Sequence, residues 1–353
     1  MMKGMRKVIL AVGGTGGHIV PALATRELFH SKGVETLLIG KGLEGHPVIQ
    51  DNNVAYREIP SGLPALASPL VMLRRGKAIL AGYQHSLKVF REFEPDLVVG
   101  FGSYHSLPVV LAAARKGLPM FLHEQNVVPG KVNQLFSRFA KGVGVNFSTT
   151  AKRFPCPSRE VFVARRTQKQ HVQCSGSPRI CVVGGSQGAR ILNQIVPRAL
   201  CQLRETFPNI HVHHIVGPMG EIRDVEVCYT QGEISHCVKH FETHMLDVLI
   251  SSDLVISRAG ATILDELLWA KTPAIFIPYP GAYGHQQANA QFFVENIRGG
   301  EMILETELNE KILVKKVMLA LDSQTSEARR QSLCNYEKHR SRISFYQFIC
   351  EHL

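Results

Sequence analysis

Two copies of one local pattern, about half a chain apart, constrain this fold more than any other feature. In each copy a short apolar run leads into a glycine-rich turn and then into an amphipathic stretch. The first turn is Gly-Gly-Thr-Gly-Gly-His at residues 13–18, and the second is Gly-Gly-Ser-Gln-Gly-Ala at residues 184–189. Further apolar runs alternate with helical patterns after each copy, as in parallel sheets covered by helices. We therefore predict an α/β protein with two Rossmann-like domains.

The domain boundary is predicted in a segment that is poor in periodic apolar residues, Cys156–Pro178. We assign residues 1–160 to the first domain and 161–339 to the second, within the usual size range for domains. A C-terminal helix at about residues 340–353, with Ile343, Tyr346, Ile349 or Cys350, and Leu353 on one face, is expected to pack back on the first domain. Eight cysteines without paired spacing favour reduced thiols, with neither disulfide nor zinc.

Charge is distributed unevenly along the chain. Residues 1–160 hold 20 Lys and Arg against 10 Asp and Glu, a net +10, whereas residues 161–353 hold 20 against 19, a net +1. A basic half indicates nucleic acid, anionic lipid or a polyphosphate as a partner. No apolar run reaches the ~18 residues that a membrane-spanning helix needs. The N-terminus lacks the apolar stretch of a secretion signal, so we expect no secretion.

Each glycine turn lies where a strand passes into a helix. That context lets backbone N–H groups approach an anionic ligand at the positive end of the helix, although a single such turn is often only a tight connection. An NAD site would also need a carboxylate at the end of the second strand, where this chain reads Ile39-Gly40-Lys41. A Walker-type lysine is absent as well. The sequence therefore gives little support to an NAD site or to a Walker-type nucleotide site.

Polar side chains follow the strands of the first half at their carboxyl ends. His18 ends the first glycine turn, where it could accept a proton near neutral pH or simply bond backbone at the helix entry. Residues 100–106, which include Tyr104, and residues 123–126, which include Glu124, follow two later strands. Either segment could be a capped turn, but a position on the same edge as His18 favours one shared site.

The second half offers two further loops of this kind. Residues 257–266 enter a helix whose N-terminus could hold a diphosphate, with Glu266 about one turn in. The alternative is that Asp265 and Glu266 only stabilise the helix start. Residues 277–290 form a long polar loop that leads into another helix, which is either a ligand contact or a plain connection.

Residues 63–82 combine leucines with interleaved cations. An apolar surface rimmed by Lys and Arg is typical of a protein that rests on an anionic membrane. The alternative is a helix that packs its apolar side on the domain core. The residues expected to meet a membrane are Leu66, Leu70, Leu73, Arg74, Arg75 and Lys77.

Taken in order, these motifs resemble one family. GGTGGH, GFGSYHSLP, LHEQN followed by PGKVN, VVGGSQGARILN, SRAGATILDELL and PYPGAYGHQQANA span about residues 7–290. Together they are similar to the MurG family of bacterial glycosyltransferases. The resemblance implies the GT-B fold, two Rossmann-like domains with parallel sheets facing across a cleft. It implies transfer of N-acetylglucosamine (GlcNAc) from UDP-GlcNAc to the C4 hydroxyl of lipid I, the undecaprenyl-diphospho-MurNAc-pentapeptide, with inversion. It also implies no metal or other cofactor, and a peripheral location on the cytoplasmic face of the inner membrane.

The resemblance further implies individual contacts with the donor. At the domain junction the family's arginine faces the diphosphate, and here Arg166 is the better positional match, with Arg165 next to it. Glu242 lies where the family's backbone reads the uracil edge. The other implied contacts are Thr15, Gly16 and Gly17 in the first turn; Asn126 beside the sugar; Ser186 and Gln187 at the diphosphate; Ala261, Thr262, Ile263, Leu264, Asp265 and Glu266 at the phosphate and ribose; and His285, Gln286 and Gln287 at the donor sugar.

A mechanism follows as a hypothesis. His18 is the first candidate for the general base, with Glu124 and Tyr104 as orienting or alternative groups. Two other function classes stay open. A sugar-nucleotide epimerase of the same fold would not need a lipid-facing basic patch. A nucleic-acid-binding protein would explain the charge but not the two glycine turns, so no nucleic acid is expected as a partner.

Overall fold

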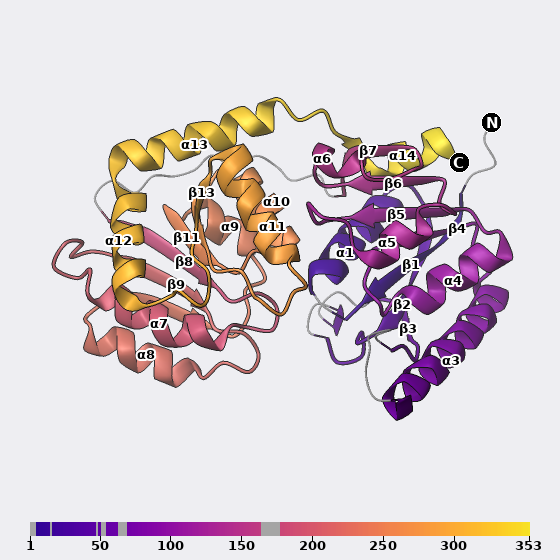
Figure 1. Cartoon of the computed structure of the whole chain (residues 1–353), viewed down its shortest axis with the longest axis horizontal. Helices are drawn as coiled ribbons and strands as arrows, with labels where there is room; N and C mark the ends of the chain where they lie inside the picture. The colour runs from indigo at the N-terminus through magenta and orange to yellow at the C-terminus, as the bar shows by residue number, and fades with distance from the viewer. Residues whose placement is uncertain (1–4, 15, 47–48, 51–53, 63–68, 164–176) are drawn as a thin grey trace. The chain divides into compact units, whose positions relative to one another are not determined.

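The structure is a computed structural model that describes residues 5–14, 16–46, 49–50, 54–62, 69–163 and 177–353. Contacts divide the chain into two compact units. Unit one comprises Met1–Arg166 together with Ser341–Leu353, and unit two comprises Thr167–Arg340. The end of the chain therefore returns to the unit in which the chain begins, as the yellow ribbon of Figure 1 shows.

Among the described residues, unit one contains an eight-stranded sheet in the order β14-β7-β6-β5-β4-β1-β2-β3. Every neighbouring pair is parallel. The strands are β1 (Lys7–Gly13), β2 (Glu35–Lys41), β3 (Tyr56–Glu58), β4 (Leu97–Gly100), β5 (Met120–Glu124), β6 (Gly142–Val145), β7 (Ser158–Phe162) and β14 (Ile343–Ser344).

Helices cover both faces of this sheet. Val8 and Leu10 of β1 face one apolar core, which α1 and α14 complete, and Ile9 and Ala11 face a second core with α3, α4 and α5. A parallel sheet that is buried on both sides explains why its strands read as continuous apolar runs. The helices are α1 (Gly16–His30), α3 (Pro69–Phe93), α4 (Leu107–Lys116), α5 (Lys131–Phe136), α6 (Ser148–Ala151) and α14 (Phe345–His352).

The C-terminal helix α14 packs on unit one through a face that matches the expected one only in part. Phe345, Phe348 and Ile349 are fully or almost fully buried, whereas Leu353 is half exposed. The helix begins only at Phe345, where the hydroxyl of the capping residue Ser344 accepts a hydrogen bond from Gln347 N at 3.1 Å. Ile343 precedes the helix and belongs to β14. The expected face is therefore right in part: Ile349 is buried and Ile343 and Tyr346 pack against the same core, whereas Leu353 is exposed and the buried Phe345 and Phe348 were not expected.

Within the described part of unit two, a six-stranded parallel sheet has the order β10-β9-β8-β11-β12-β13. Its strands are β8 (Arg179–Val183), β9 (His211–Ile215), β10 (Ser235–Lys239), β11 (Leu254–Ser257), β12 (Ala274–Phe276) and β13 (Gly300–Met302). Its helices are α7 (Arg190–Cys201), α8 (Ile222–Gln231), α9 (Met245–Ile250), α10 (Ala261–Ala270), α11 (His285–Phe292), η1 (Phe293–Ile297), α12 (Glu310–Leu321) and α13 (Ser323–Lys338).

The strand orders locate where a ligand would bind in each unit. In unit one the chain runs from β1 to β2 and β3 on one side, and β4 then pairs with the other side of β1. Unit two repeats this arrangement, with β9 and β10 on one side of β8 and β11 on the other. Ligands of open α/β sheets bind outside the carboxyl ends of the strands where the order reverses. Both glycine turns follow the strand at that point.

Candidate active site

In unit one, the turn after β1 touches the turn after β4. A Cβ atom on Gly13 would lie 2.2 Å from Ser103 Oγ, so only glycine permits this approach. Gly16 is buried and begins α1, and Gly17 is half-buried, with no atom within 4 Å of the position of a Cβ. His18 is half-buried in the first turn of α1. The structure therefore places His18 at the reversal point of the sheet.

The carboxylate of Glu124 is almost completely buried and holds the turn that follows β5. Its Oε1 accepts hydrogen bonds from Asn126 N at 2.9 Å and from Asn126 Nδ2 at 3.1 Å. Its Oε2 accepts from Gly130 N at 2.9 Å and from Asn133 Nδ2 at 2.8 Å. Four donors occupy the two oxygens, so the geometry supports an orienting role for Glu124 toward Asn126 over a role in proton transfer.

The turn after β4 carries two half-buried rings, Tyr104 and His105. The backbone carbonyl of Tyr104 accepts a hydrogen bond from Ser61 Oγ at 3.0 Å, which ties this turn to the chain after β3. Burial lowers the pKa of His105, and the nearby Lys41 ammonium lowers it further against the opposing charge of Glu58. His105 is therefore neutral at neutral pH. Sequence reasoning included it only as a member of the loop.

In unit two, the glycine turn after β8 rests on the turn after β9 without intervening side chains. A Cβ atom on Gly188 would lie 2.4 Å from the carbonyl oxygen of Val216, and one on Gly217 would lie 2.3 Å from Gly188 Cα. Both glycines also have positive φ angles, 76° and 86°. The half-buried Ser186 and the exposed Gln187 lie at the tip of this turn, ahead of α7. The arrangement presents backbone and hydroxyl groups at a helix N-terminus, where an anion is favoured.

Gln286 joins the other two loops of unit two. Its Oε1 accepts hydrogen bonds from Ala259 N at 3.2 Å, after β11, and from Tyr279 N at 2.9 Å, after β12. The buried side chain of Asn289 donates to Ala259 O at 3.1 Å. The amide oxygen of Gln286 is thus used internally, which leaves its NH2 group for a ligand. His285 is half-buried and Gln287 is exposed at the start of α11.

Sequence reasoning missed Arg258, which connects the same two loops. The side chain is largely buried, forms an ion pair with Glu305 and donates to Ile277 O at 3.0 Å. Its guanidinium lies 5.4 Å from the ring centroid of Tyr279. A charged residue directly after a buried strand was the available signal, because a buried charge requires partners.

Residues 261–266 at the start of α10 differ in burial and in contacts. Ala261 is buried, and Thr262, Ile263 and Glu266 are half-buried near the helix N-terminus. The side chain of Leu264 is fully buried in the core, and its N–H donates to Gly260 O. Asp265 Oδ1 lies 3.4 Å from the guanidinium of Arg340. Leu264 is therefore committed to the core, and Asp265 pairs with Arg340, a partner that neither interpretation of the sequence included.

The side chain of Glu242 is directed into its own unit. Its Oε2 lies 2.8 Å from Lys239 Nζ and 3.2 Å from His213 Nε2, and its Oε1 accepts from His244 N at 2.9 Å. Burial raises the pKa of this carboxyl, but the bonds from Lys239 and His244 outweigh that effect, and the pKa lies below its usual value. Because the side chain is held in this way, the backbone of Glu242 is the part that remains for recognition of a ligand.

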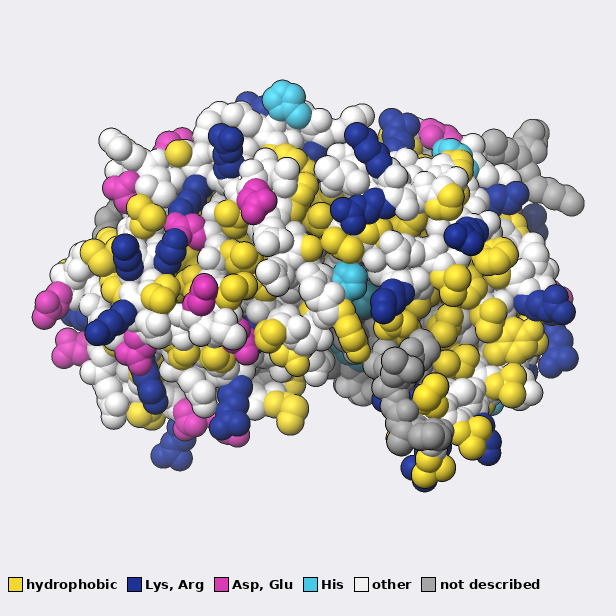
Figure 2. All heavy atoms as spheres, in the orientation of Figure 1, with side chains coloured by type: hydrophobic (Ala, Val, Ile, Leu, Met, Phe, Trp, Pro, Cys, Tyr) yellow, Lys and Arg dark blue, Asp and Glu magenta, His cyan; other side chains and the backbone are white. Residues whose placement is uncertain are grey.

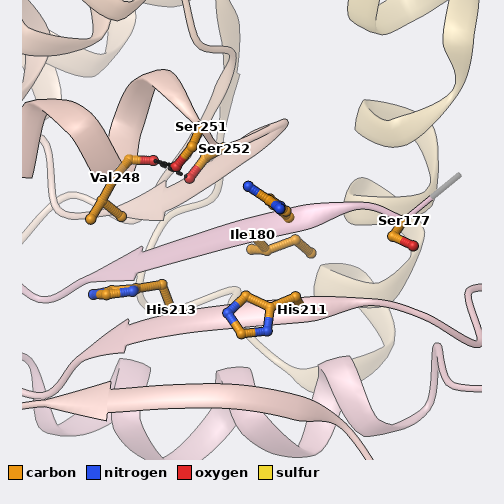
Figure 3. A pocket seen from close by; sticks show the side chains of 8 residues that line it. Ser177, Ile180, His211, His213, Val248, Ser251 and Ser252 are labelled. Atoms are coloured by element: carbon orange, nitrogen blue, oxygen red, sulfur yellow. Dashed lines mark hydrogen bonds between the residues drawn. The ribbon is translucent and has the colours of Figure 1, made fainter. Parts of the chain in front are cut away.

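A hollow of about 400 Å³ lies beside the first residues of strands β8 and β9, at the end of the unit-two sheet opposite the glycine turn. Figure 3 shows it beside β8 and β9, with Ser251 and Ser252 both donating to Val248 O, at 2.9 Å and 2.7 Å. Arg179 and His211 of its lining begin β8 and β9, and His213, two residues further along β9, contacts Glu242. Its lining residues are Ser177, Arg179, Ile180, His211, His213, Val248, Ser251 and Ser252.

The two halves of α3 differ in exposure. Val89 and Phe90 near its C-terminus are buried against α4 and the sheet. Near its N-terminus Leu70 and Leu73 are 60% and 57% exposed, and Met72 and Leu80 are also exposed. Arg74 and Lys77 are exposed and Arg75 is half-buried. Figure 2 shows apolar and basic side chains together over α3 in its lower right part. Core packing and an exposed apolar–basic surface therefore occupy different halves of one helix.

Four of the expected site residues lie outside the described residues. They are Thr15, Leu66, Arg165 and Arg166. Of the described helices, none combines the length and the apolar character that crossing a membrane requires.

Comparison with known proteins identifies the family. Residues 8–145 match the glycosyltransferase family 28 N-terminal domain, and residues 179–344 match the C-terminal domain of the same family. The chain belongs to glycosyltransferase family 28. It is 56% identical to the UDP-N-acetylglucosamine--N-acetylmuramyl-(pentapeptide) pyrophosphoryl-undecaprenol N-acetylglucosamine transferase of Chlamydia felis, and the match covers 99% of each chain. The corresponding transferase of Chlamydia trachomatis serovar D is 54% identical over 100% of each chain.

A solved structure agrees with this assignment. The MurG structure from Acinetobacter baumannii superposes with a TM-score of 0.75 at 26% identity and covers 98% of this chain and 99% of its own. The two parallel-sheet units, each with a glycine turn, are those of the GT-B fold, which confirms the predicted fold class. This member of family 28 is a glycosyltransferase, and neither the family nor these relatives supports the epimerase alternative.

Proposed function

We propose that this chain transfers GlcNAc from UDP-GlcNAc to the C4 hydroxyl of lipid I, which yields lipid II and UDP. The observation that carries the proposal is the 56% identity, across 99% of both chains, to a transferase named for this donor and acceptor. The site geometry supports it, because each unit has a glycine turn at the reversal point of its sheet. The same substrate assignment implies peptidoglycan precursor synthesis as the process served.

The donor is assigned to unit two. Its diphosphate meets Ser186, Gln187 and the N-terminus of α7, where the helix dipole and free N–H groups favour negative charge. Glu266 of α10 accepts from the ribose hydroxyls, and the backbone at Glu242 reads the uracil edge. Gln286 offers its NH2 group to the sugar, since its oxygen is held by Ala259 N and Tyr279 N.

Proton transfer is assigned to His18 of unit one. In this mechanism the C4 hydroxyl of the acceptor gives its proton to the imidazole as its oxygen forms a bond to the anomeric carbon. The bond between that carbon and the β-phosphate oxygen breaks on the opposite face, and UDP leaves with the electron pair. Glu124 accepts hydrogen bonds from the backbone N–H and the side-chain NH2 group of Asn126. These bonds fix the position in which Asn126 would contact the sugar of UDP-GlcNAc. A positioned base usually contributes ~10²–10⁴-fold to the rate.

The exposed half of α3 is assigned to the anionic cytoplasmic face of the membrane, where the lipid acceptor resides. Leu70 and Leu73 supply apolar area, and Arg74 and Lys77 supply positive charge beside it. Near an anionic surface each cation contributes about 1 kcal/mol, so the double substitution R74Q/K77Q should weaken vesicle binding ~30-fold. The matched control is K311Q/K315Q, which removes two exposed cations from α12 of unit two. Equal weakening by both pairs would reject a specific role for α3.

The activity is tested by transfer of labelled GlcNAc from UDP-GlcNAc to a lipid I analogue, with UDP-GalNAc as the donor control. We expect lipid II formation with stoichiometric UDP release, and little transfer from UDP-GalNAc. Donor turnover without acceptor, or transfer to no lipid-linked MurNAc analogue, would contradict the proposal.

A further inference from the structure

A chain of hydrogen bonds that starts from two buried side chains runs next to the glycine turn of unit two. His214 of β9 is fully buried, with its Nδ1 2.9 Å from Tyr229 Oη and its Nε2 3.1 Å from Asn193 Oδ1. Asn193 of α7 in turn donates through Nδ2 to Val216 O at 3.0 Å. The chain therefore links α8, β9 and α7 to the backbone that follows β9.

The partners fix the direction of every bond in this chain. Val216 O can only accept, so Asn193 must present its NH2 group to that oxygen and its Oδ1 to His214. His214 Nε2 therefore carries the proton. A neutral imidazole has one donor and one acceptor, so Nδ1 accepts from the Tyr229 hydroxyl. Burial lowers the pKa of His214 to about 3, in agreement with a neutral ring.

The chain ends where the glycine turn makes its closest backbone contact. Val216 O lies 2.4 Å from the position that a Cβ on Gly188 would occupy, and Gly217 follows directly. The ring of His240 also contacts this backbone, with Nδ1 3.0 Å from Gly217 O. A change in the position of the Val216 carbonyl would therefore move the turn that carries Ser186 and Gln187.

We propose that His214 is a positioning residue for the donor: through Asn193 it fixes the Val216 carbonyl and so sets the backbone geometry of the diphosphate-binding turn. The inference rests on the assignment of the donor to unit two. It predicts that a break in the chain weakens nucleotide binding and leaves acceptor use and the chemical step unchanged.

Two substitutions at His214 separate this role from a purely structural one. The amide of His214→Gln can place an N–H near the position of Nε2 and retain the bond to Asn193, whereas the shorter His214→Asn cannot. We expect H214N to raise the donor KM ~10-fold, with kcat and the acceptor KM within about twofold of wild type, and H214Q to recover most of that loss. Tyr229→Phe, which leaves the bond to Asn193 intact, is the matched control and should have a near-normal donor KM.

UDP binding, measured by calorimetry, tests the same inference without turnover. Asn193→Asp keeps an acceptor for His214 but loses the donor to Val216 O, so its Kd for UDP should rise ~10-fold even if H214N does not fold. A wild-type Kd in folded N193D, or an H214Q variant as impaired as H214N, would overturn the inference. Failure of the proposed function would look different: the wild-type chain would not transfer GlcNAc to lipid I, whatever these variants do to UDP binding.

Discussion

The neutral, buried His214 predicts a specific dependence of stability on pH. Its pKa is about 3 in the folded chain and ~6.5 when exposed, so the unfolded state takes up a proton first as the pH falls. The contribution of His214 to the free energy of unfolding is complete above pH 6.5 and decreases by up to ~1.4 kcal/mol per unit below it. Between pH 8 and pH 5 the integrated loss is about 2 kcal/mol.

The assay is urea unfolding followed by the fluorescence of Trp269, the single tryptophan of the chain, which lies in α10 of the same unit as His214. Wild type and H214Q are compared at several pH values from 8 to 5. The other histidines titrate in both proteins and cancel in the comparison. We expect the wild type to lose about 2 kcal/mol more than H214Q over this range. Equal pH dependence in the two proteins would refute a neutral, buried His214.

Three further outcomes are expected, two of transfer assays and one of a binding measurement. His18→Ala should lower kcat ~10²–10⁴-fold with little change in UDP binding, and near-wild-type turnover would reject His18 as the base. Glu266→Ala should mainly raise the donor KM, whereas an effect on kcat alone would count against its ribose contact. Gly188→Ala places a Cβ 2.4 Å from Val216 O at a φ of 76°, so UDP binding measured by calorimetry should fall by at least tenfold; an unchanged Kd would mean that this close contact is not required.

The fold was predictable from local pattern because its two controlling features are local. A glycine turn between an apolar run and an amphipathic stretch defines a strand–helix connection at residues 13–18 and again at 184–189. The structure places both turns at the reversal points of parallel sheets. The residue at which α14 begins was not predictable in the same way. Whether Ile343 belongs to a helix or to a strand depends on its pairing with Val161, which is far away in the chain.

The roles of polar residues in the site were harder to predict, because they depend on donors and acceptors that sequence spacing does not reveal. Glu124 and Asn126 occur in one polar run, yet the carboxylate is committed to Gly130 and Asn133 as well. Likewise, the amide oxygen of Gln286 accepts a hydrogen bond from the backbone N–H of Ala259, 27 residues earlier. Periodicity identifies buried apolar faces, whereas hydrogen-bond partners follow only from the packed structure.

The uneven charge of the chain follows from how each unit is proposed to hold its ligand. A diphosphate bound by a helix N-terminus and a glycine turn meets oriented dipoles, and these require no fixed cation. Next to that turn lie His214, Asn193 and Tyr229, a chain of neutral groups that can fix backbone position without adding charge to a buried site. The net +1 of residues 161–353 is consistent with such a site. The net +10 of residues 1–160 then belongs to the unit proposed to meet an anionic surface. Attraction to such a surface acts over a Debye length, so the cations do not need exact positions. Binding at unit one should therefore weaken steeply with salt, while UDP binding at unit two should respond only slightly.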